Sequence, residues 1–229
     1  LGRSFQLRVL AGTTGRSATE LLDTLDAAVR AQVIVADDRP GSYRFSHALV
    51  QESLYQGLSP AERARLHLAA GMALQASDDH EPRWAELAHH FYLAQPLSER
   101  SDVQRYAELA GDEAMLRFAW DAAAVHYRHA LDALPATETT HRCELLLALG
   151  DAHNRADSGA GDAPAARAAF LQAFDLARSQ EDGPSMARAA IGYAGINLVA
   201  VFGGTRQLEL LEEAATALGH ADSPLRARL

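Results

Sequence analysis

The stretch most suggestive of chemistry is residues 10–17, LAGTTGRS, whose glycines are spaced almost as in a phosphate-binding loop. That loop has the pattern G-x-x-x-x-G-K-[ST], in which backbone amides surround the phosphates and the lysine reaches them. Here Leu10 stands in place of the first glycine and Arg16 in place of the lysine. A buried strand must also precede such a loop, whereas the preceding residues are typical of a short helix. We therefore interpret Gly12 and Gly15 as a helix end and a turn, and not as a nucleotide site.

Four histidines are the candidate metal ligands of the chain. Adjacent residues on a helix point about 100° apart, so His89 and His90 are poorly placed to share one ion. His126 and His129 are three residues apart on one helical face, but no third ligand is apparent beside them. We interpret all four as histidines on the surface of helical repeats, and we expect no metal site. Cys143 lies on a predicted helix without an activating base, so we expect no catalytic residues and no enzymatic activity in this chain.

The composition restricts the class of protein further. The 229 residues carry a formal net charge of −9, and all 21 basic residues are arginine. This balance argues against a nucleic-acid surface, because phosphate binding depends on clustered cations. A single cysteine excludes an intrachain disulfide, and no apolar run approaches the length of a membrane span. Since the chain begins with leucine and ends on LRARL, we interpret it as a fragment of a longer cytoplasmic protein.

The first 59 residues mix helix and strand. Ser17 and Glu20 form a capping box, in which the two side chains satisfy free amides of a first helical turn. The predicted elements are a short helix at 5–12, a helix at 18–31, strands at 33–37 and 43–45, and a helix at 47–58. This order is typical of a winged-helix-like domain whose first helix is missing.

The helix at 18–31 occupies the position at which a winged helix reads DNA. It carries Glu20, Asp23 and Asp26 against a single basic residue, Arg30. Acidic side chains facing phosphates would repel them, so we expect no direct contact with nucleic acid.

The segment from 60 to 229 is predicted to be helical throughout. Ser59 and Glu62 form a second capping box, with a proline at the first helical position. The predicted helices are 60–77, 82–95, 102–117, 120–134, 138–154, 163–179, 184–201 and 205–218.

A pattern of glycine followed by small, large and small residues recurs along these helices. The three sets are Gly111 with Ala123, Tyr127, Ala130 and Pro135; Gly150 with Ala166, Phe170 and Ala173; and Gly192 with Gln207, Leu211 and Ala214. Small residues let two helices approach, and the large side chain fills the space between them. Such hairpins cannot bury their apolar faces alone, so we expect them to stack into a solenoid.

These residues resemble known families. RYAELAGDEAMLRFAWDAAAVHYRHALDALP (105–135) resembles a tetratricopeptide repeat, and the later units resemble degenerate copies. The order of parts resembles the region after the nucleotide-binding domain in bacterial signal-transduction ATPases of the STAND class. Those proteins include large LuxR-type transcriptional regulators and adenylate-cyclase-linked ATPases. The segments that carry the resemblance are LGRSF (1–5), ELLDTLDAAVRAQVIV (20–35), YRFSHALVQESLYQGLSPAERARLH (43–67) and AELAHHFYLA (85–94).

The resemblance implies a mainly α chain in two parts. A winged-helix-like domain at 1–59, with its first helix truncated, would precede a tetratricopeptide-like solenoid at 60–229, truncated at its C-terminal end. ATP or ADP would bind an ATPase domain upstream, and this chain would hold no cofactor. In such proteins the winged helix packs on the nucleotide domain, and the repeats bind proteins or a small effector.

His47, in YRFSHALVQE, is the one candidate ligand for the nucleotide. A related eukaryotic class of nucleotide switches carries Met-His-Asp at the matching place, where the histidine contacts the bound diphosphate. Here the triplet is Ser46-His47-Ala48, so the aspartate is missing. The resemblance implies a possible sensor role for His47 in the full-length parent. The alternative is a histidine that caps the helix at 47–58 or packs structurally.

The sequence thus predicts a regulatory and interaction region of an ATPase-linked signalling protein, with a LuxR-type regulator as the first expectation. The alternatives are a stand-alone helical-repeat scaffold and the regulatory arm of an adenylate cyclase. Aromatic residues concentrate early in the repeats, where most should be core and some could line a groove for a peptide or effector. They are Trp84, Phe91, Tyr92, Tyr106, Phe118 and Trp120.

Overall fold

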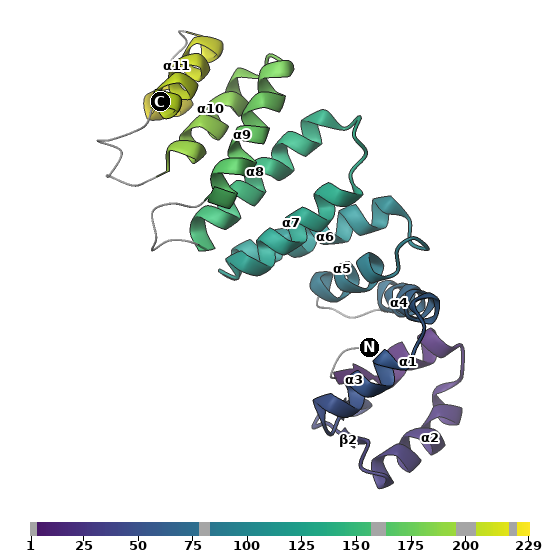
Figure 1. Cartoon of the computed structure of the whole chain (residues 1–229). Helices are drawn as coiled ribbons and strands as arrows, with labels where there is room; N and C mark the ends of the chain where they lie inside the picture. The colour runs from purple at the N-terminus through teal and green to yellow at the C-terminus, as the bar shows by residue number, and fades with distance from the viewer. Residues whose placement is uncertain (1–3, 78–82, 157–163, 196–204, 220–223) are drawn as a thin grey trace. The chain divides into compact units, whose positions relative to one another are not determined.

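The computed structural model describes residues 4–77, 83–156, 164–195, 205–219 and 224–229 (Figure 1). The described chain is mainly α-helical, with one small antiparallel sheet. It divides into two compact units, Leu1–Tyr106 and Ala107–Leu229, with the division inside α6 (Arg100–Leu116). The sequence predicts a domain boundary between residues 59 and 60. The division into compact units does not test that boundary, which stays a prediction.

The sheet of the first unit has three strands in the order β1-β3-β2. β2 (Ile34–Ala36) and β3 (Ser42–Phe45) are the two predicted strands, and both are confirmed. The predicted helix at 5–12 is confirmed from Leu7 onward, but its first two residues belong to β1 (Ser4–Gln6), where Phe5 pairs with Tyr43 of β3 and stacks on its ring at 5.9 Å. This pairing joins residues far apart in the sequence, so the local pattern could not indicate it.

Two helices follow β1 and pack with the sheet. α1 (Leu7–Thr14) ends at Gly15, whose φ of 68° is the left-handed conformation that glycine adopts without strain. α2 (Ala18–Arg30) begins at the predicted capping box, where the Glu20 carboxylate accepts from the Ser17 amide at 2.8 Å. The prediction that Gly12 ends a helix is wrong, because Gly12 lies inside α1. A Cβ there would stand 2.8 Å from the Cβ of Ala73, so Gly12 permits the close approach of α1 to α4.

The first unit continues with three helices, α3 (Ala48–Gln56), α4 (Pro60–Gln75) and α5 (Trp84–Leu93). The capping box at Ser59 is confirmed, with the Glu62 carboxylate 2.8 Å from the Ser59 amide. α4 and α5 pack against each other, and Gly71 faces the ring of Phe91, 3.3 Å from where its Cβ would be. This glycine–aromatic contact precedes the three predicted from the sequence.

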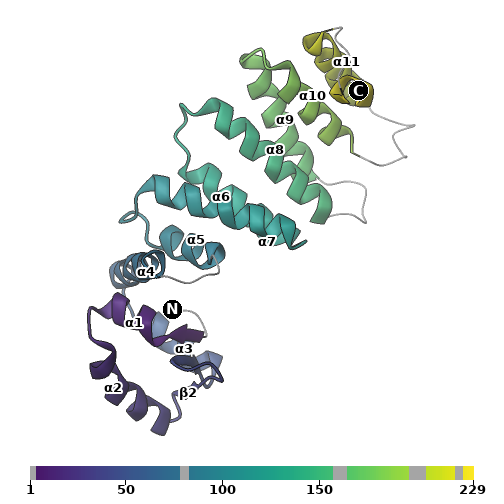
Figure 2. The same cartoon turned by 180° about the vertical axis from the view of Figure 1, so that it is seen from behind.

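The second unit consists of helices that pack on their neighbours in sequence (Figures 1 and 2). Besides the end of α6, they are α7 (Trp120–Ala133), α8 (Thr139–Ala156), α9 (Pro164–Ser179), α10 (Gly183–Ala194), α11 (Thr205–Leu218) and α12 (Pro224–Arg228). All but α12 are confirmed predictions. The predicted breaks at 158–161 and 203–204 lie outside the described residues. The predicted helix at 184–201 is too long, because α10 ends at Ala194 and Gly195, with a φ of 71°, is not helical.

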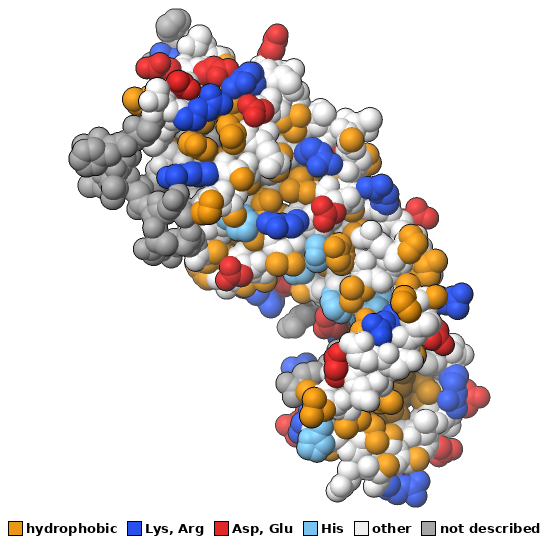
Figure 3. All heavy atoms as spheres, viewed as in Figure 1, with side chains coloured by type: hydrophobic (Ala, Val, Ile, Leu, Met, Phe, Trp, Pro, Cys, Tyr) orange, Lys and Arg blue, Asp and Glu red, His pale blue; other side chains and the backbone are white. Residues whose placement is uncertain are grey.

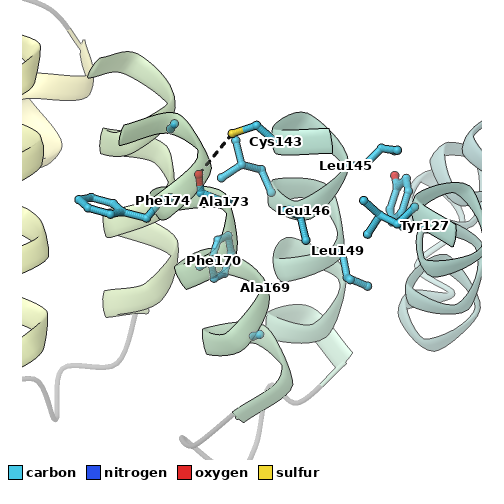
Figure 4. Packing of buried hydrophobic residues seen from close by; sticks show 14 of the residues in the cluster. Tyr127, Cys143, Leu145, Leu146, Leu149, Ala169, Phe170, Ala173 and Phe174 are labelled. Carbon is cyan, nitrogen blue, oxygen red and sulfur yellow. Dashed lines mark hydrogen bonds between the residues drawn. The ribbon is translucent and has the colours of Figure 1, made fainter. Parts of the chain in front are cut away.

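Glycines and aromatic rings interlock between these helices. A Cβ on Gly111 would stand 2.7 Å from the ring of Tyr127, and one on Gly150 would stand 2.7 Å from the ring of Phe170. Both rings are buried in one core that extends from α6 to α11, part of which is drawn in Figure 4. The small–large interlock predicted for the first two sets is therefore confirmed.

The third predicted set packs differently. The atoms nearest to a Cβ on Gly192 belong to Phe170 of α9, and not to Leu211 of α11. On α11 it is Leu210 that is buried, at 1% exposure, together with Ala214. Phe170 thus fills the space beside two glycines, one on α8 and one on α10. The sequence spacing did not reveal this, because one ring serves both neighbours.

No helix within the described ranges is long and apolar enough to cross a membrane.

Replacing Gly150 with alanine is expected to destabilise the second unit, because the new Cβ would overlap the Phe170 ring. Overpacking of this kind costs about 1–3 kcal/mol, which exceeds the gain of up to about 1 kcal/mol in helix propensity. Urea unfolding followed by circular dichroism measures the difference. Gly57→Ala is the matched control, since its Cβ would meet the Leu54 carbonyl oxygen at an ordinary 3.4 Å. Equal stability of Gly150→Ala and the unchanged chain would contradict the interlock.

Candidate functional site

His47 lies at the N-terminus of α3, where its side chain is exposed. Its backbone is extended, as is usual just before a helix, but its imidazole makes no capping hydrogen bond. The preceding Ser46 fixes this point of the chain, because its hydroxyl donates to the carbonyl oxygens of Gln32 and Val33 at 2.5 and 3.0 Å. His47 is therefore the N-cap residue of α3, as the alternative interpretation expected, although its side chain does not cap the helix. Its role as a nucleotide sensor stays a prediction.

A chain of hydrogen-bonded side chains joins three helices of the first unit. The Tyr55 hydroxyl of α3 lies 3.1 Å from Nε2 of His67 on α4. Nδ1 of His67 lies 2.9 Å from Nδ1 of His90 on α5. His89 stands beside both imidazoles, with ring centroids 5.5 Å from His67 and 5.4 Å from His90. Three histidines from two helices thus gather at one place.

The environment of this cluster favours neutral imidazoles. His67 and His90 are 6% and 4% exposed. Burial, together with the neighbouring imidazoles, lowers the pKa of His67 to about 4 and that of His90 to about 3. Burial also lowers the pKa of His89. A buried imidazole without a carboxylate partner loses hydration on protonation and gains no compensating charge.

The interpretation of His90 as a surface histidine is therefore wrong, and the sequence analysis missed His67 altogether. His67 lies 23 residues before His90 on another helix, so only the packing of α4 on α5 brings them together. The sequence feature that could have identified His67 is its place among the apolar residues of α4, which indicates a buried histidine. In the described part of the chain, no group of three or more His, Cys, Asp and Glu side chains is arranged to hold a metal ion.

The other histidine pair lies on α7. His126 and His129 are both half-buried, so they also belong to the packed part of their helix and not to its fully exposed side. On α8, Cys143 is buried and lies 3.5 Å from the Ala173 carbonyl oxygen (Figure 4). Burial raises the pKa of the Cys143 thiol, which disfavours the nucleophilic thiolate.

A hydrogen-bonded histidine–glutamate pair and an arginine–glutamate ion pair lie over alternate helices of the second unit. Nε2 of His141 on α8 lies 3.0 Å from both carboxylate oxygens of Glu108 on α6. The guanidinium of Arg188 on α10 donates to both oxygens of Glu144 on α8 at 2.7 and 2.8 Å. We call these four residues the ion-pair row. On the face shown in Figure 3, basic and acidic side chains are likewise interspersed over the second unit.

A tyrosine hydroxyl lies near this row. Tyr127 of α7 donates to the Asp112 carboxylate of α6 at 2.8 Å. Burial raises the pKa of Tyr127, and the hydrogen bond to Asp112 adds to the effect. Asp151 of α8 also has a raised pKa through burial.

The early aromatic residues differ widely in burial. Phe91 and Tyr106 are core residues at 2% and 3% exposure, with their rings stacked at 5.2 Å. Trp84 and Tyr92 are half-buried. Phe118 is different, since it is 75% exposed in the turn between α6 and α7.

The turn around Phe118 is a local exception. Its φ of 61° is unusual for a large side chain, and its ring meets Trp120 edge-on at 5.3 Å. Arg155 of α8 lies over the Trp120 ring at 5.2 Å. Of the aromatic residues named from the sequence, Phe118 is thus the one most exposed to solvent.

The lowered pKa values of His67 and His90 predict a loss of stability in acid. Both imidazoles are held neutral in the folded chain, whereas unfolded histidines titrate near 6.5. Stability is therefore complete above pH 6.5 and declines as the pH falls toward 4, because the unfolded chain takes up protons first. The expected loss by pH 5 is roughly 1 to 2 kcal/mol for each histidine.

Urea unfolding at pH 7.5 and pH 5 measures this dependence. A chain carrying His67→Gln and His90→Gln should lose less stability between the two pH values than the unchanged protein. Carboxylates titrate equally in both chains, so the difference isolates the imidazoles. An equal loss of unfolding free energy between pH 7.5 and pH 5 in the two chains would contradict the lowered pKa values of His67 and His90.

Comparisons of this chain with the models of known protein families, with curated proteins and with solved structures found no match.

Proposed function

We propose that this chain is the regulatory and partner-binding region of an ATPase-linked signalling protein, as the resemblance to STAND-class regulators implies. In this proposal the second unit binds a protein or a small effector, and the first unit transmits that event to a nucleotide domain upstream. The chain itself binds and couples, and it does not catalyse. A transcriptional regulator of the LuxR type is the first candidate for the parent.

The observation that carries the proposal is the recurrent glycine–aromatic interlock. It joins Gly71 with Phe91, Gly111 with Tyr127 and Gly150 with Phe170, each time between two helices that follow each other. The glycines are 40 and 39 residues apart, since 111 − 71 = 40 and 150 − 111 = 39. A period of this length is typical of stacked helical hairpins, whose usual role is binding along an extended surface.

The first unit supports the other half of the proposal. Two helices, two of the three strands and a third helix follow one another in the order expected of a winged-helix-like domain. β1 adds a third strand to the sheet, as in a small domain whose wing is anchored by its own N-terminal segment. In a parent with an upstream nucleotide domain, the exposed His47 at the start of α3 is free to face that domain.

The ion-pair row is the proposed contact surface of the second unit. Exposed ion pairs contribute about 0–1 kcal/mol each, so a partner can exchange them for its own charges at little cost. Arg188 and Glu144 are 43% and 49% exposed, which places both within reach of a partner. The row offers both signs of charge, and it therefore suits a polar peptide or a charged effector more than an apolar one.

The first test addresses the nucleotide. ATP or ADP at millimolar concentration should leave the thermal unfolding midpoint of this chain unchanged, because residues 10–17 form a helix end, a turn and a helix start. Differential scanning fluorimetry measures the midpoint, and a tightly binding nucleotide would raise it. A shift that saturates with nucleotide concentration would mean that the chain contains a complete site.

The second test addresses His47 in the full-length parent. His47→Ala should change the basal rate of ATP hydrolysis if the imidazole contacts the bound nucleotide, since a lost charge-assisted hydrogen bond alters the balance of resting and active states. Ser46→Ala is a useful comparison, because it changes the anchoring of the same segment and keeps the imidazole. An unchanged basal rate for His47→Ala, in a folded protein, would refute the sensor role.

The alternatives are separated by the coding sequence of the parent. A G-x-x-x-x-G-K-[ST] loop upstream supports the ATPase-linked switch, and its absence supports a stand-alone scaffold. A helix-turn-helix downstream indicates transcription, whereas a cyclase domain upstream indicates second-messenger output.

A further inference from the structure

α3 is attached to the rest of the first unit mainly by polar groups. None of its nine residues is buried, and its leucines Leu49 and Leu54 are 82% and 57% exposed. The Arg63 guanidinium of α4 donates to the Leu58 carbonyl oxygen at 3.1 Å and lies 4.7 Å over the Tyr55 ring. The same guanidinium also donates to the backbone and side-chain carbonyl oxygens of Gln56, each at 3.1 Å. The Tyr55 hydroxyl is in addition hydrogen-bonded to His67. Because hydrogen bonds hold the C-terminal end of α3, a change in the protonation of their partners can release the helix.

The hydrogen-bond chain accommodates one added proton but not two. When both imidazoles are neutral, one of the two Nδ1 atoms carries a hydrogen and the other accepts it across 2.9 Å. With one further proton, His67 can donate from Nδ1 to His90 and from Nε2 to the Tyr55 oxygen, so every polar atom is still paired. A second proton places hydrogen on both Nδ1 atoms, and the 2.9 Å contact then becomes a repulsion between two cations.

The surrounding charges do not offset this repulsion. From α5, His89 and Arg83 add positive charge near the pair, and both act against protonation of His90. The acidic neighbour on α5 is Glu86, which already accepts from Arg83 at 3.0 and 2.5 Å. From α4, Arg63 adds a further cation beside Tyr55.

Two further elements border this region. α3 contributes Glu52, whose carboxylate accepts from Gln56 at 2.6 Å on the same helix. α1, which packs on α4, contributes Arg8, whose guanidinium donates to Gln6 at 2.7 Å. The side chains whose charges act on His90 are His67, His89 and Arg83, so the two imidazoles share a mostly cationic environment.

We infer that the Tyr55–His67–His90 chain is an acid-sensitive latch, which holds the C-terminal end of α3 on the α4–α5 hairpin and releases it as His67 and His90 take up protons. This inference concerns the first unit alone and does not depend on the proposed function. Release frees a helix with an exposed apolar side. Because an isolated nine-residue helix is only marginally stable in water, α3 should also fray once it is released.

The size of the effect follows from the two titrations. A histidine that titrates at its ordinary 6.5 after release and at about 4 when latched shifts the balance toward release by about 30-fold at pH 5. His90 adds to this shift to the extent that release exposes it. A tenfold increase in opening is therefore a conservative expectation.

Hydrogen exchange of the backbone amides tests the latch in the whole 229-residue chain. Protection factors, corrected for the intrinsic pH dependence of exchange, are measured at pH 7.5 and 5.0 in buffer containing EDTA. Protection over Ala48–Gln56 should fall at least about tenfold, while that of α8 and α9 should stay within about twofold. NMR of the imidazoles in the same samples records their protonation.

Three variants make the test specific. His67→Gln with His90→Gln keeps hydrogen-bonding side chains that do not titrate, so the pH dependence of α3 protection should disappear. Tyr55→Phe removes the hydroxyl that reaches His67, so α3 should already exchange quickly at pH 7.5 and change little at pH 5.0. His153→Gln, on α8, is the matched control and should keep the full dependence of the unchanged chain.

Two results would overturn the latch. One is unchanged protection of α3 down to a pH at which NMR shows both imidazoles protonated. The other is an equal loss of protection in the double glutamine variant. Should that variant fail to fold, Tyr55→Phe decides alone: a loss of protection with the same pH dependence as in the unchanged chain would overturn the inference.

Discussion

The close approach of neighbouring helices, made possible by glycine, is the constraint on which the second unit depends. Gly111 and Gly150 leave space that the rings of Tyr127 and Phe170 fill, and any side chain at either glycine would overlap the ring. A hairpin built this way buries only one of its two apolar faces, so each one needs the next. The result is one continuous core from α6 to α11. Polar side chains are consequently left to the outer positions, where the ion-pair row lies.

The first unit has two separate packing regions, and α3 lies outside both. Its sheet and α2 share a small core around Phe5, Leu21, Leu25 and Ile34, while α4 and α5 pack through Gly71 and its facing ring. α3 belongs to neither core. Polar groups hold it, and two of them, His67 and His90, are buried in a way that costs free energy as soon as they gain charge. Stability and sensitivity to protonation therefore come from the same side chains.

Local chemistry was predictable from the sequence, and contacts between distant residues were not. The capping boxes at Ser17 and Ser59 place both partners within four residues, so the helix starts were predicted correctly. The same holds for most helices, whose apolar period is local. Residues 5 and 6 of β1 were predicted as the start of a helix, because the partner strand lies nearly 40 residues away. Gly12 was assigned to a helix end because Ala73, the residue it makes room for, cannot be seen from its neighbours.

The candidate site shows the same limit more sharply. His47 and His90 were both considered from the sequence. His67, the hydrogen-bond partner of His90, was not. Adjacent histidines on one helix indicate little, because their side chains diverge. It is the packing of α5 on α4 that selects one of them, His90, and turns it toward His67. Sequence spacing within one element could therefore not reveal a cluster built across two.

α3 connects the two histidine sites of the first unit. His47 precedes its first residue, and Tyr55 lies in its last turn, so a helix of nine residues, about 13 Å long, separates them. As long as it stays folded, a short helix moves as one piece, so a displacement at one end displaces the other end too. A helix that buried apolar side chains would resist such movement, whereas α3 buries none. Under the proposed function, this low cost of movement is what allows α3 to connect events at the nucleotide domain with the first helical hairpin.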